Sequence, residues 1–343
     1  MKPDHQTLAV IGAGSWGTAL AKLLADKGAA VRLWARRPAL AQAIDRDREN
    51  RDYLPGAPLP GNLFVTSDLT QAVAGACGVV MVVPSHGFRP QLAALAPFLD
   101  PSALLVSAVK GVENDTLCTM SQVMSQVLPG PLAGRIAVLA GPSFAREVAA
   151  GQPTAVTVAG ASLDIARAWQ RLFHTDRFRV YTSTDLIGLE LGGAVKNVVA
   201  IAAGIADGLG FGTNTRAALI TRGLAEIIRL GLAMGANPLT FSGLGGLGDL
   251  VLTCTGDLSR NRQVGLALGQ GKGLAQILAG MQMVAEGVRT TRSIYQLAAR
   301  HRVEMPITEQ VYRVLYEGQR PMTAVQELLA REGKDELAVA AVG

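Results

Sequence analysis

The sequence has few aromatic residues, few cysteines and no long uncharged apolar run. Aromatic residues make up 5% of the 343 positions, whereas glycine occurs 39 times. This balance favours closely packed helices and glycine-dependent turns over a strand-rich sandwich. Cys77, Cys118 and Cys254 form no C-x-x-C pair, so we predict neither a disulfide framework nor a metal site, and a reducing compartment fits this cysteine usage.

Membrane insertion and export are not predicted either. The longest apolar segment, 189–204, carries Glu190 and Lys196, so no membrane-spanning helix is expected. The first residues are polar and lead directly into a short apolar run, without the features of a secretory signal. We therefore expect a cytoplasmic protein.

The charge pattern argues against nucleic-acid binding. The net charge is +5, but lysines and arginines are scattered, and no basic run alternates with aromatic residues. One local cluster of arginines is interrupted by acidic residues and is typical of a site for small anions. It consists of Arg32, Arg36, Arg37, Arg46, Arg48 and Arg51.

The chain has the pattern of an α/β protein with two domains. Short apolar runs separated by helix-length segments predict an N-terminal Rossmann-type doubly wound parallel sheet. These runs are 8–11, 31–34, 79–83, 104–107, 136–139, 155–158 and 178–181. From about Thr184 onward the pattern is helical, with helices expected at 216–234, 287–300, 308–317 and 323–330. We predict a dinucleotide-binding domain over 1–186, an all-helical substrate-binding domain over 187–331 and a flexible tail over 332–343.

A G-x-G-x-x-G motif follows the first predicted strand and precedes a helical pattern. In such a loop Gly12 allows the tight turn, Gly14 lets the backbone approach a pyrophosphate, and Gly17 permits close helix packing. The second predicted strand ends before Arg36 and Arg37, where an NAD site usually has an acidic residue. Because guanidinium groups bind a 2′-phosphate well, the motif favours NADP(H); a pair of exposed surface arginines is the alternative.

Lys196 is the candidate acid or base. It lies in a segment that is otherwise built for close apolar packing, and a lysine drawn partly out of water has a lowered pKa that suits proton transfer. The alternative is a lysine that snorkels from a core helix to the surface. In the helical half, Asp249 is surrounded by apolar residues and glycines; it is either an N-cap or a partner for Lys196.

Several polar residues follow predicted strands or begin a helix. Lys110 is a candidate for an anionic substrate or a solvated turn lysine, and Ser143 is a site residue or an N-cap. His86, which follows the run 79–83, is likewise a site residue or an ordinary surface histidine. The run Ser259, Arg260 and Asn261 at a helix start suits a phosphate, or else a capped surface helix.

Together these motifs resemble bacterial NAD(P)-dependent glycerol-3-phosphate dehydrogenase. The resemblance covers nearly the whole chain and is carried by residues 12–20, 141–145, the Lys196 segment, the Asp249 segment and 259–261. It implies interconversion of dihydroxyacetone phosphate and sn-glycerol 3-phosphate for glycerophospholipid synthesis, by a homodimer. Together with the two arginines after the second strand, it leads us to expect NADP(H) as the cofactor, with NAD(H) as an alternative. We hypothesise that the nicotinamide delivers hydride to C2 while Lys196, oriented by Asp249, donates the proton to the C2 oxygen.

The resemblance also implies two sets of site residues. Those expected at the cofactor are Ser15, Trp16, Arg36, Arg37, Lys110, Ala145, Arg260, Val284 and Glu286, besides Gly12, Gly14 and Gly17. Those expected at the substrate are Lys110, Gly141, Ser143, Lys196, Asp249, Ser259, Arg260 and Asn261.

Two other functions compete with this one. A β-hydroxyacid-type reductase would share the layout and the catalytic lysine but would act on a carboxylate, and fold alone does not exclude it. A non-catalytic nucleotide-sensing module would bind NADP(H) and leave Lys196 and Asp249 without a chemical role.

Overall fold

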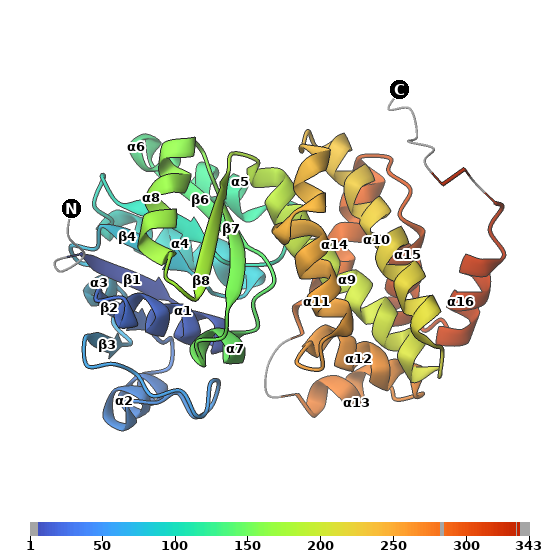
Figure 1. Ribbon diagram of the computed structural model, residues 1–343, viewed down its shortest axis with the longest axis horizontal. Coiled ribbons are helices and arrows are strands. Elements are labelled where there is room, and N and C mark those ends of the chain that lie inside the picture. Colours follow the sequence, from blue (N-terminus) through green and yellow to red (C-terminus); the bar gives the residue numbers. More distant parts are fainter. Residues whose placement is uncertain (1–5, 282–284, 334, 337–343) are drawn as a thin grey trace. The chain divides into compact units, whose positions relative to one another are not determined.

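The computed structural model describes residues 6–281, 285–333 and 335–336. The chain divides into two compact units. The first contains the described residues up to Val109 together with Met120–Leu186, and the second contains Lys110–Thr119 together with the described residues from Ile187 onward (Figure 1).

The first unit is built around one sheet, whose eight strands within the described residues have the order β3-β2-β1-β4-β5-β6-β7-β8. Their bounds are β1 Thr7–Ile11, β2 Ala30–Trp34, β3 Leu63–Thr66, β4 Gly78–Met81, β5 Leu104–Ser107, β6 Ile136–Ala140, β7 Thr154–Gly160 and β8 Phe178–Ser183. The strands from β1 to β6 are parallel and have the order 3-2-1-4-5-6, which confirms the predicted doubly wound Rossmann sheet. The strand order reverses between β1 and β4, where such folds bind dinucleotides.

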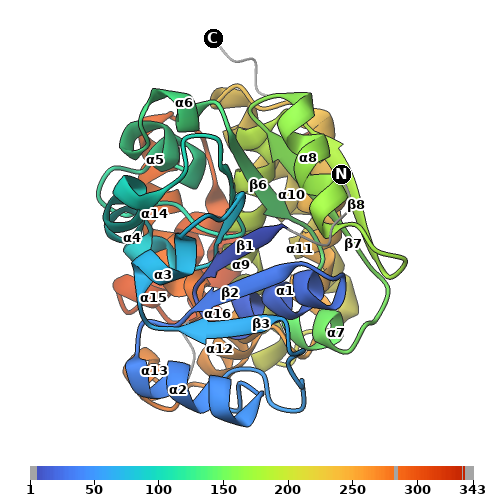
Figure 2. The same ribbon diagram turned by 90° about the vertical axis from the view of Figure 1, so that its left-hand side faces the viewer.

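Helices cover both faces of this sheet. Figure 2 shows α3, α4 and α5 on one face and α1 and α8 on the other. The helices of the unit are α1 Ser15–Asp26, α2 Pro38–Asp47, α3 Leu69–Val73, α4 Phe88–Leu95, α5 Met120–Val127, α6 Gly130–Ala133, α7 Ala145–Ala149 and α8 Leu163–Phe173, with 3-10 turns η2 Ser85–Gly87 and η3 Ala96–Phe98. Because both faces are covered, the inner strands are buried along their whole length, as the uninterrupted apolar runs predicted.

Two features of the sheet differ from the prediction. Strand β3 has no counterpart among the predicted strands, because its four residues include the exposed Phe64 and give only a short apolar signal. Strand β7 pairs with β6 in the antiparallel direction. The connection between them, residues 141–153, contains only the five-residue helix α7, whereas parallel neighbours are usually joined by a longer crossover helix.

The second unit is helical, as predicted. Its elements are α9 Leu186–Gly208, α10 Thr213–Ala233, η4 Pro238–Ser242, η5 Leu244–Gly248, α11 Asp249–Thr255, α12 Arg260–Gly269, α13 Leu274–Ala279, α14 Glu286–Arg300, α15 Pro306–Tyr316 and α16 Pro321–Leu329. The turn η5 is a π-helical turn that leads directly into α11. Helix α9 runs through the middle of the unit (Figure 1), and every residue from Gly188 to Ala206 is buried.

Helix α9 is also long and apolar enough to cross a membrane, but 89% of its apolar window is buried inside the structure. The helix therefore satisfies the length and composition of a membrane span while serving as the core helix of this unit.

Helices α9 and α12 approach so closely that only glycine fits along their contact. A Cβ atom on Gly204 would lie 2.0 Å from the carbonyl oxygen of Arg262, and one on Gly265 would lie 2.1 Å from that of Ile201. One turn further, Gly208 and Gly269 face each other in the same manner. We call these four glycines the glycine seam. The seam holds the helix that carries Lys196 directly against the helix that begins with Arg260.

We predict that Gly265→Ala destabilises the protein by at least about 1–3 kcal/mol, because the added methyl group must push the α9 backbone away. Urea denaturation monitored by circular dichroism measures the change. Gly273→Ala is the matched control, since a Cβ there meets no atom within 4 Å. Equal urea midpoints for the two variants would contradict the claim that only glycine fits between α9 and α12.

Candidate active site

Three charged side chains meet in the helical unit. Lys196 Nζ donates to Asp249 Oδ1 at 2.5 Å, and Lys110 Nζ donates to Asp249 Oδ2 at 2.9 Å. Two ammonium groups therefore share one carboxylate. Asp249 is 0% exposed and Lys196 is 4% exposed, so Lys196 does not snorkel to the surface. Asp249 is not an N-cap, because the cap of α11 is Gly248 and the carboxylate turns toward the lysines.

The surroundings of Lys196 change its proton affinity. Burial lowers the pKa of Lys196 to about 7, the Asp249 carboxylate opposes this shift, and the Lys110 ammonium adds to it. An ammonium group that titrates near neutral pH can both release and take up a proton under physiological conditions. Lys110 keeps more contact with water, its side chain being 18% exposed.

Two residues of this cluster were missed in the sequence. Thr253 lies one turn after Asp249 on α11; its Oγ1 accepts a hydrogen bond from Lys196 Nζ at 2.9 Å and donates to the Asp249 carbonyl at 2.6 Å. Asn197 follows Lys196 in the buried helix, and its Nδ2 donates to the Lys110 carbonyl at 3.3 Å. The signal for Asn197 was a second polar residue inside an apolar helix, and the signal for Thr253 was its i,i+4 spacing from Asp249.

The predicted phosphate loop begins α12. Ser259 is the N-cap, and its Oγ accepts from the Arg262 backbone at 3.3 Å, so the capping role is present. Asn261 is buried: its Nδ2 donates to Asn197 Oδ1 at 2.8 Å, and its Oδ1 accepts from the Gly287 backbone at 2.9 Å. Asn261 thereby ties α12 to α9 and to the start of α14. The Arg260 side chain is exposed at the first position of α12.

An ion network fixes the same end of α12. Asp207 at the end of α9 accepts from Arg262 Nε at 2.8 Å and from Arg216 Nη2 at 2.6 Å. Arg262 also donates to Asp257 at 2.9 Å. The network joins α9, α10 and α12 at Arg262, the residue that follows Arg260 and Asn261 in the chain.

In the sheet unit, the glycine loop has the geometry that a dinucleotide requires. Gly12 has φ +124°, and its Cβ position would lie 2.6 Å from the Val82 carbonyl oxygen. A Cβ on Gly17 would lie 1.8 Å from the Gly12 carbonyl oxygen, whereas the space at Gly14 is open within 4 Å. Helix α1 starts at Ser15 and has no side-chain cap, so its N-terminal amides face this open space. A pyrophosphate fits these features.

Trp16 adds a further feature to this loop. Its Nε1 is buried and has no hydrogen-bond partner within the described part of the chain. The Trp16 ring packs against the small apolar cluster of Ala19, Leu54 and Ala57.

The remaining predicted residues of the sheet unit lie after β2 and β6. Arg36 and Arg37 are both exposed, and Arg37 contacts Asp52 and Tyr53. Gly141 has φ +142° directly after β6, and Ser143 Oγ donates to its carbonyl at 2.9 Å. Ser143 is not the N-cap of α7, since that position is Phe144 and the helix begins at Ala145.

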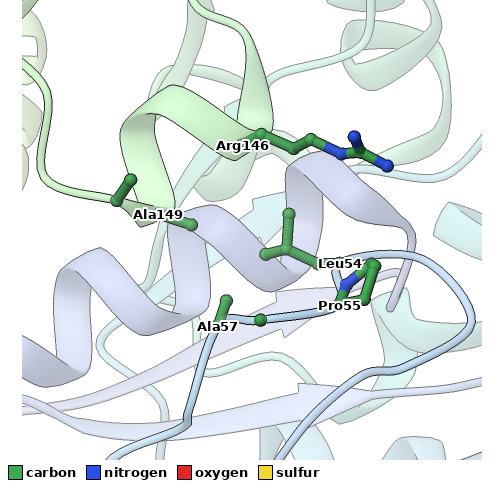
Figure 3. Close-up of a pocket in the computed structure, with 7 residues that line it drawn as sticks. Leu54, Pro55, Ala57, Arg146 and Ala149 are labelled. Atoms are coloured by element: carbon green, nitrogen blue, oxygen red, sulfur yellow. The ribbon is translucent and has the colours of Figure 1, made fainter.

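The sheet unit also contains a cavity of about 270 Å³ that no predicted site residue lines. Its walls come from the loop after α2 and from α7, as Figure 3 shows for Leu54, Pro55 and Ala57 opposite Arg146 and Ala149. Of the two remaining predicted cofactor residues, Glu286 is the first residue of α14, and Val284 lies outside the described residues.

The comparisons with known proteins agree with these motifs. The model of the NAD-dependent glycerol-3-phosphate dehydrogenase N-terminus matches residues 7–166, and that of the C-terminus matches residues 185–326. The chain belongs to the NAD-dependent glycerol-3-phosphate dehydrogenase family. The predicted family resemblance is thereby confirmed.

Individual relatives cover almost the whole chain. It is 57% identical over 337 residues to the glycerol-3-phosphate dehydrogenase [NAD(P)+] of Syntrophobacter fumaroxidans, covering 98% of this chain and 99% of the relative. It is 58% identical to the protein of the same name from Geobacter metallireducens, covering 96% and 99%. Among solved structures, the glycerol-3-phosphate dehydrogenase of Coxiella burnetii has a TM-score of 0.91 at 42% identity, covering 96% and 100%.

We predict that Asp249→Asn lowers the pKa of Lys196 below its value of about 7, because the variant removes the charge that favours the ammonium form. NMR titration of the lysine Nζ signals measures this midpoint. Asp207→Asn is the control, since Asp207 is a paired, largely buried carboxylate that contacts arginines instead of Lys196. An unchanged or higher midpoint in Asp249→Asn would refute the electrostatic assignment.

Proposed function

We propose that this chain catalyses the NAD(P)H-dependent, reversible reduction of dihydroxyacetone phosphate to sn-glycerol 3-phosphate, and thereby supplies glycerophospholipid synthesis. The observation that carries the proposal is the buried cluster of Lys196, Asp249 and Lys110 in a member of this family. The names of the relatives, which cover both NAD and NADP, support the same reaction and either cofactor.

In this proposal one domain binds the cofactor and the other binds the substrate. We assign cofactor binding to the domain over 1–186, with the pyrophosphate at Gly12, Gly14 and Gly17 and the amides of Ser15 and Trp16. Arg36 and Arg37 would bind a 2′-phosphate. The helical domain over 187–331 would hold the substrate, together with Lys110, Gly141 and Ser143. Ala145, Val284 and Glu286 are proposed as further cofactor contacts.

Lys196 is the proposed proton donor. Two of the three hydrogens on its Nζ are directed to Asp249 Oδ1 and Thr253 Oγ1, which leaves the third for the C2 oxygen of the substrate. When bound, the nicotinamide supplies the hydride. In the reverse direction the neutral Lys196 amine takes up the proton, and a pKa of about 7 makes both forms available.

The substrate phosphate is proposed to bind at Ser259, Arg260 and Asn261. This loop presents a helix N-terminus and a guanidinium group, both of which stabilise phosphate oxygens. Binding energy at the phosphate holds the reacting carbon in register with Lys196 without taking part in the chemistry. The glycine seam and the Asp207 network keep the loop at a constant distance from Lys196.

We also propose a cytoplasmic homodimer without a membrane anchor, as the family resemblance implies. Light scattering of the purified protein tests the dimer.

Purified protein is expected to oxidise NADPH in the presence of dihydroxyacetone phosphate, as followed at the NADPH absorbance. A panel of keto acids and a parallel series with NADH serve as comparisons. Turnover with keto acids but not with dihydroxyacetone phosphate would favour a β-hydroxyacid-type reductase. Tight NADPH binding without any turnover would favour a sensing module.

We predict that Lys196→Met lowers kcat by roughly 10²–10⁴-fold while NADPH binding persists, because the variant removes the proton donor and preserves the side-chain volume. Steady-state assays and cofactor fluorescence measure the two quantities. Lys272→Met, at an exposed lysine of the same unit, is expected to retain the parent rate. Near-normal turnover of a folded Lys196→Met protein would exclude Lys196 as the donor.

A further inference from the structure

The loop after α2 is attached to the glycine loop by buried hydrogen bonds. Asn50 is 0% exposed, and its Nδ2 donates to the Ala13 carbonyl at 2.9 Å and to Thr18 Oγ1 at 2.8 Å. Ser15 Oγ donates to the Tyr53 carbonyl at 2.6 Å. Because both ends of the segment 50–53 are tied to residues 13–18, the side chains between them have a fixed place beside the cofactor loop.

Arg37 is held by this segment. Its Nη2 donates to Asp52 Oδ2 at 3.2 Å and to the Tyr53 hydroxyl at 3.3 Å, and its guanidinium lies 5.8 Å from the centre of the Tyr53 ring. Arg36, the neighbouring residue, has no hydrogen bond or ion pair with the described residues. The two arginines proposed for the 2′-phosphate are therefore unequal: one has a carboxylate partner and the other does not.

We infer that Asp52 is a specificity-determining residue, which lowers the preference for NADP(H) by competing with the 2′-phosphate for Arg37. The inference rests on the proposed assignment of Arg36 and Arg37 to that phosphate. NADPH must draw Arg37 away from Asp52 and place a phosphate dianion near a carboxylate. NADH has a hydroxyl at the same position and leaves the Arg37–Asp52 pair intact.

The pair has the properties that such competition requires. The Arg37 and Asp52 side chains are 55% and 59% exposed, so solvent screens their attraction and the pair opens at little cost. A buried pair would block the 2′-phosphate entirely. The exposed pair instead reduces NADPH affinity by a moderate factor, which suits an enzyme that uses both cofactors.

The test measures Kd values of NADPH and NADH by cofactor fluorescence for the parent protein and for Asp52→Asn, Asp52→Ala and Arg37→Ala. Both Asp52 variants are expected to bind NADPH three- to tenfold more tightly and NADH within twofold of the parent. Arg37→Ala is expected to weaken NADPH binding at least tenfold. The double variant Arg37→Ala, Asp52→Asn is expected to bind NADPH less than twofold more tightly than Arg37→Ala alone.

Asp47→Asn is the matched control, because it removes a carboxylate from the same arginine cluster that pairs with Arg46 and Arg51 but not with Arg37. Its NADPH affinity is expected to stay within twofold of the parent. A gain equal to that of Asp52→Asn would mean that net charge alone acts, and would overturn the inference. Circular dichroism reports that each variant is folded.

The remaining outcomes separate the inference from its premise. If Arg37→Ala weakens NADPH binding but neither Asp52 variant strengthens it, the inference about Asp52 fails and the assignment of Arg37 stands. If Arg37→Ala leaves NADPH binding unchanged, the assignment of Arg37 fails and the inference fails with it. Weaker NADH binding in Asp52→Asn, with NADPH unchanged, would show that Asp52 binds the ribose hydroxyl, which also overturns the inference.

Discussion

The helical unit depends on one buried carboxylate. Asp249 accepts from both Lys196 and Lys110, and without it the buried Lys196 ammonium would face the partly exposed Lys110 ammonium with no carboxylate between them. Removing one partner of a buried ion pair costs about 3–5 kcal/mol, because the remaining charge is left unpaired. Further residues support this cluster. Thr253 provides an additional acceptor for Lys196, and Asn197 donates to the backbone carbonyl of Lys110.

Close helix packing makes this arrangement possible. Lys196 lies on a helix that is surrounded by other helices, and small residues let them approach its backbone. Gly192 packs against Gly245 of η5, which lies four residues before Asp249. A Cβ on Gly192 would lie 2.3 Å from the Gly245 carbonyl oxygen. The glycine seam lets the backbone of α12 approach α9 equally closely. Both the Asp249 carboxylate and the proposed phosphate loop are therefore positioned by backbone contacts with a single helix, α9.

The sequence allowed some of this to be predicted. The glycine loop and the continuous apolar runs predicted the Rossmann sheet, because these patterns depend on local geometry and on burial of both faces. Lys196 and Asp249 were noticeable as charges in apolar surroundings. The sharing of Asp249 by Lys110 could not be predicted, since 139 residues separate the two in the chain. Residues 110–119 follow a strand of the sheet, and their grouping with the helical unit depends on long-range contacts such as that of Asn114 with Ser293.

In the proposed mechanism, the charge of the cluster of Lys196, Lys110 and Asp249 links proton transfer to substrate binding. With Lys196 protonated, two ammonium groups and one carboxylate carry a net charge of about +1; after donation they carry about zero. An anionic substrate bound beside the cluster would favour the charged form and raise the pKa of Lys196 from its value of about 7. By linkage, the enzyme with Lys196 protonated would bind that anion more tightly than the enzyme with Lys196 neutral. A phosphate ester would thus bind preferentially to the form of the enzyme that carries the proton needed for its reduction, whereas an uncharged ketone would gain less from this electrostatic coupling.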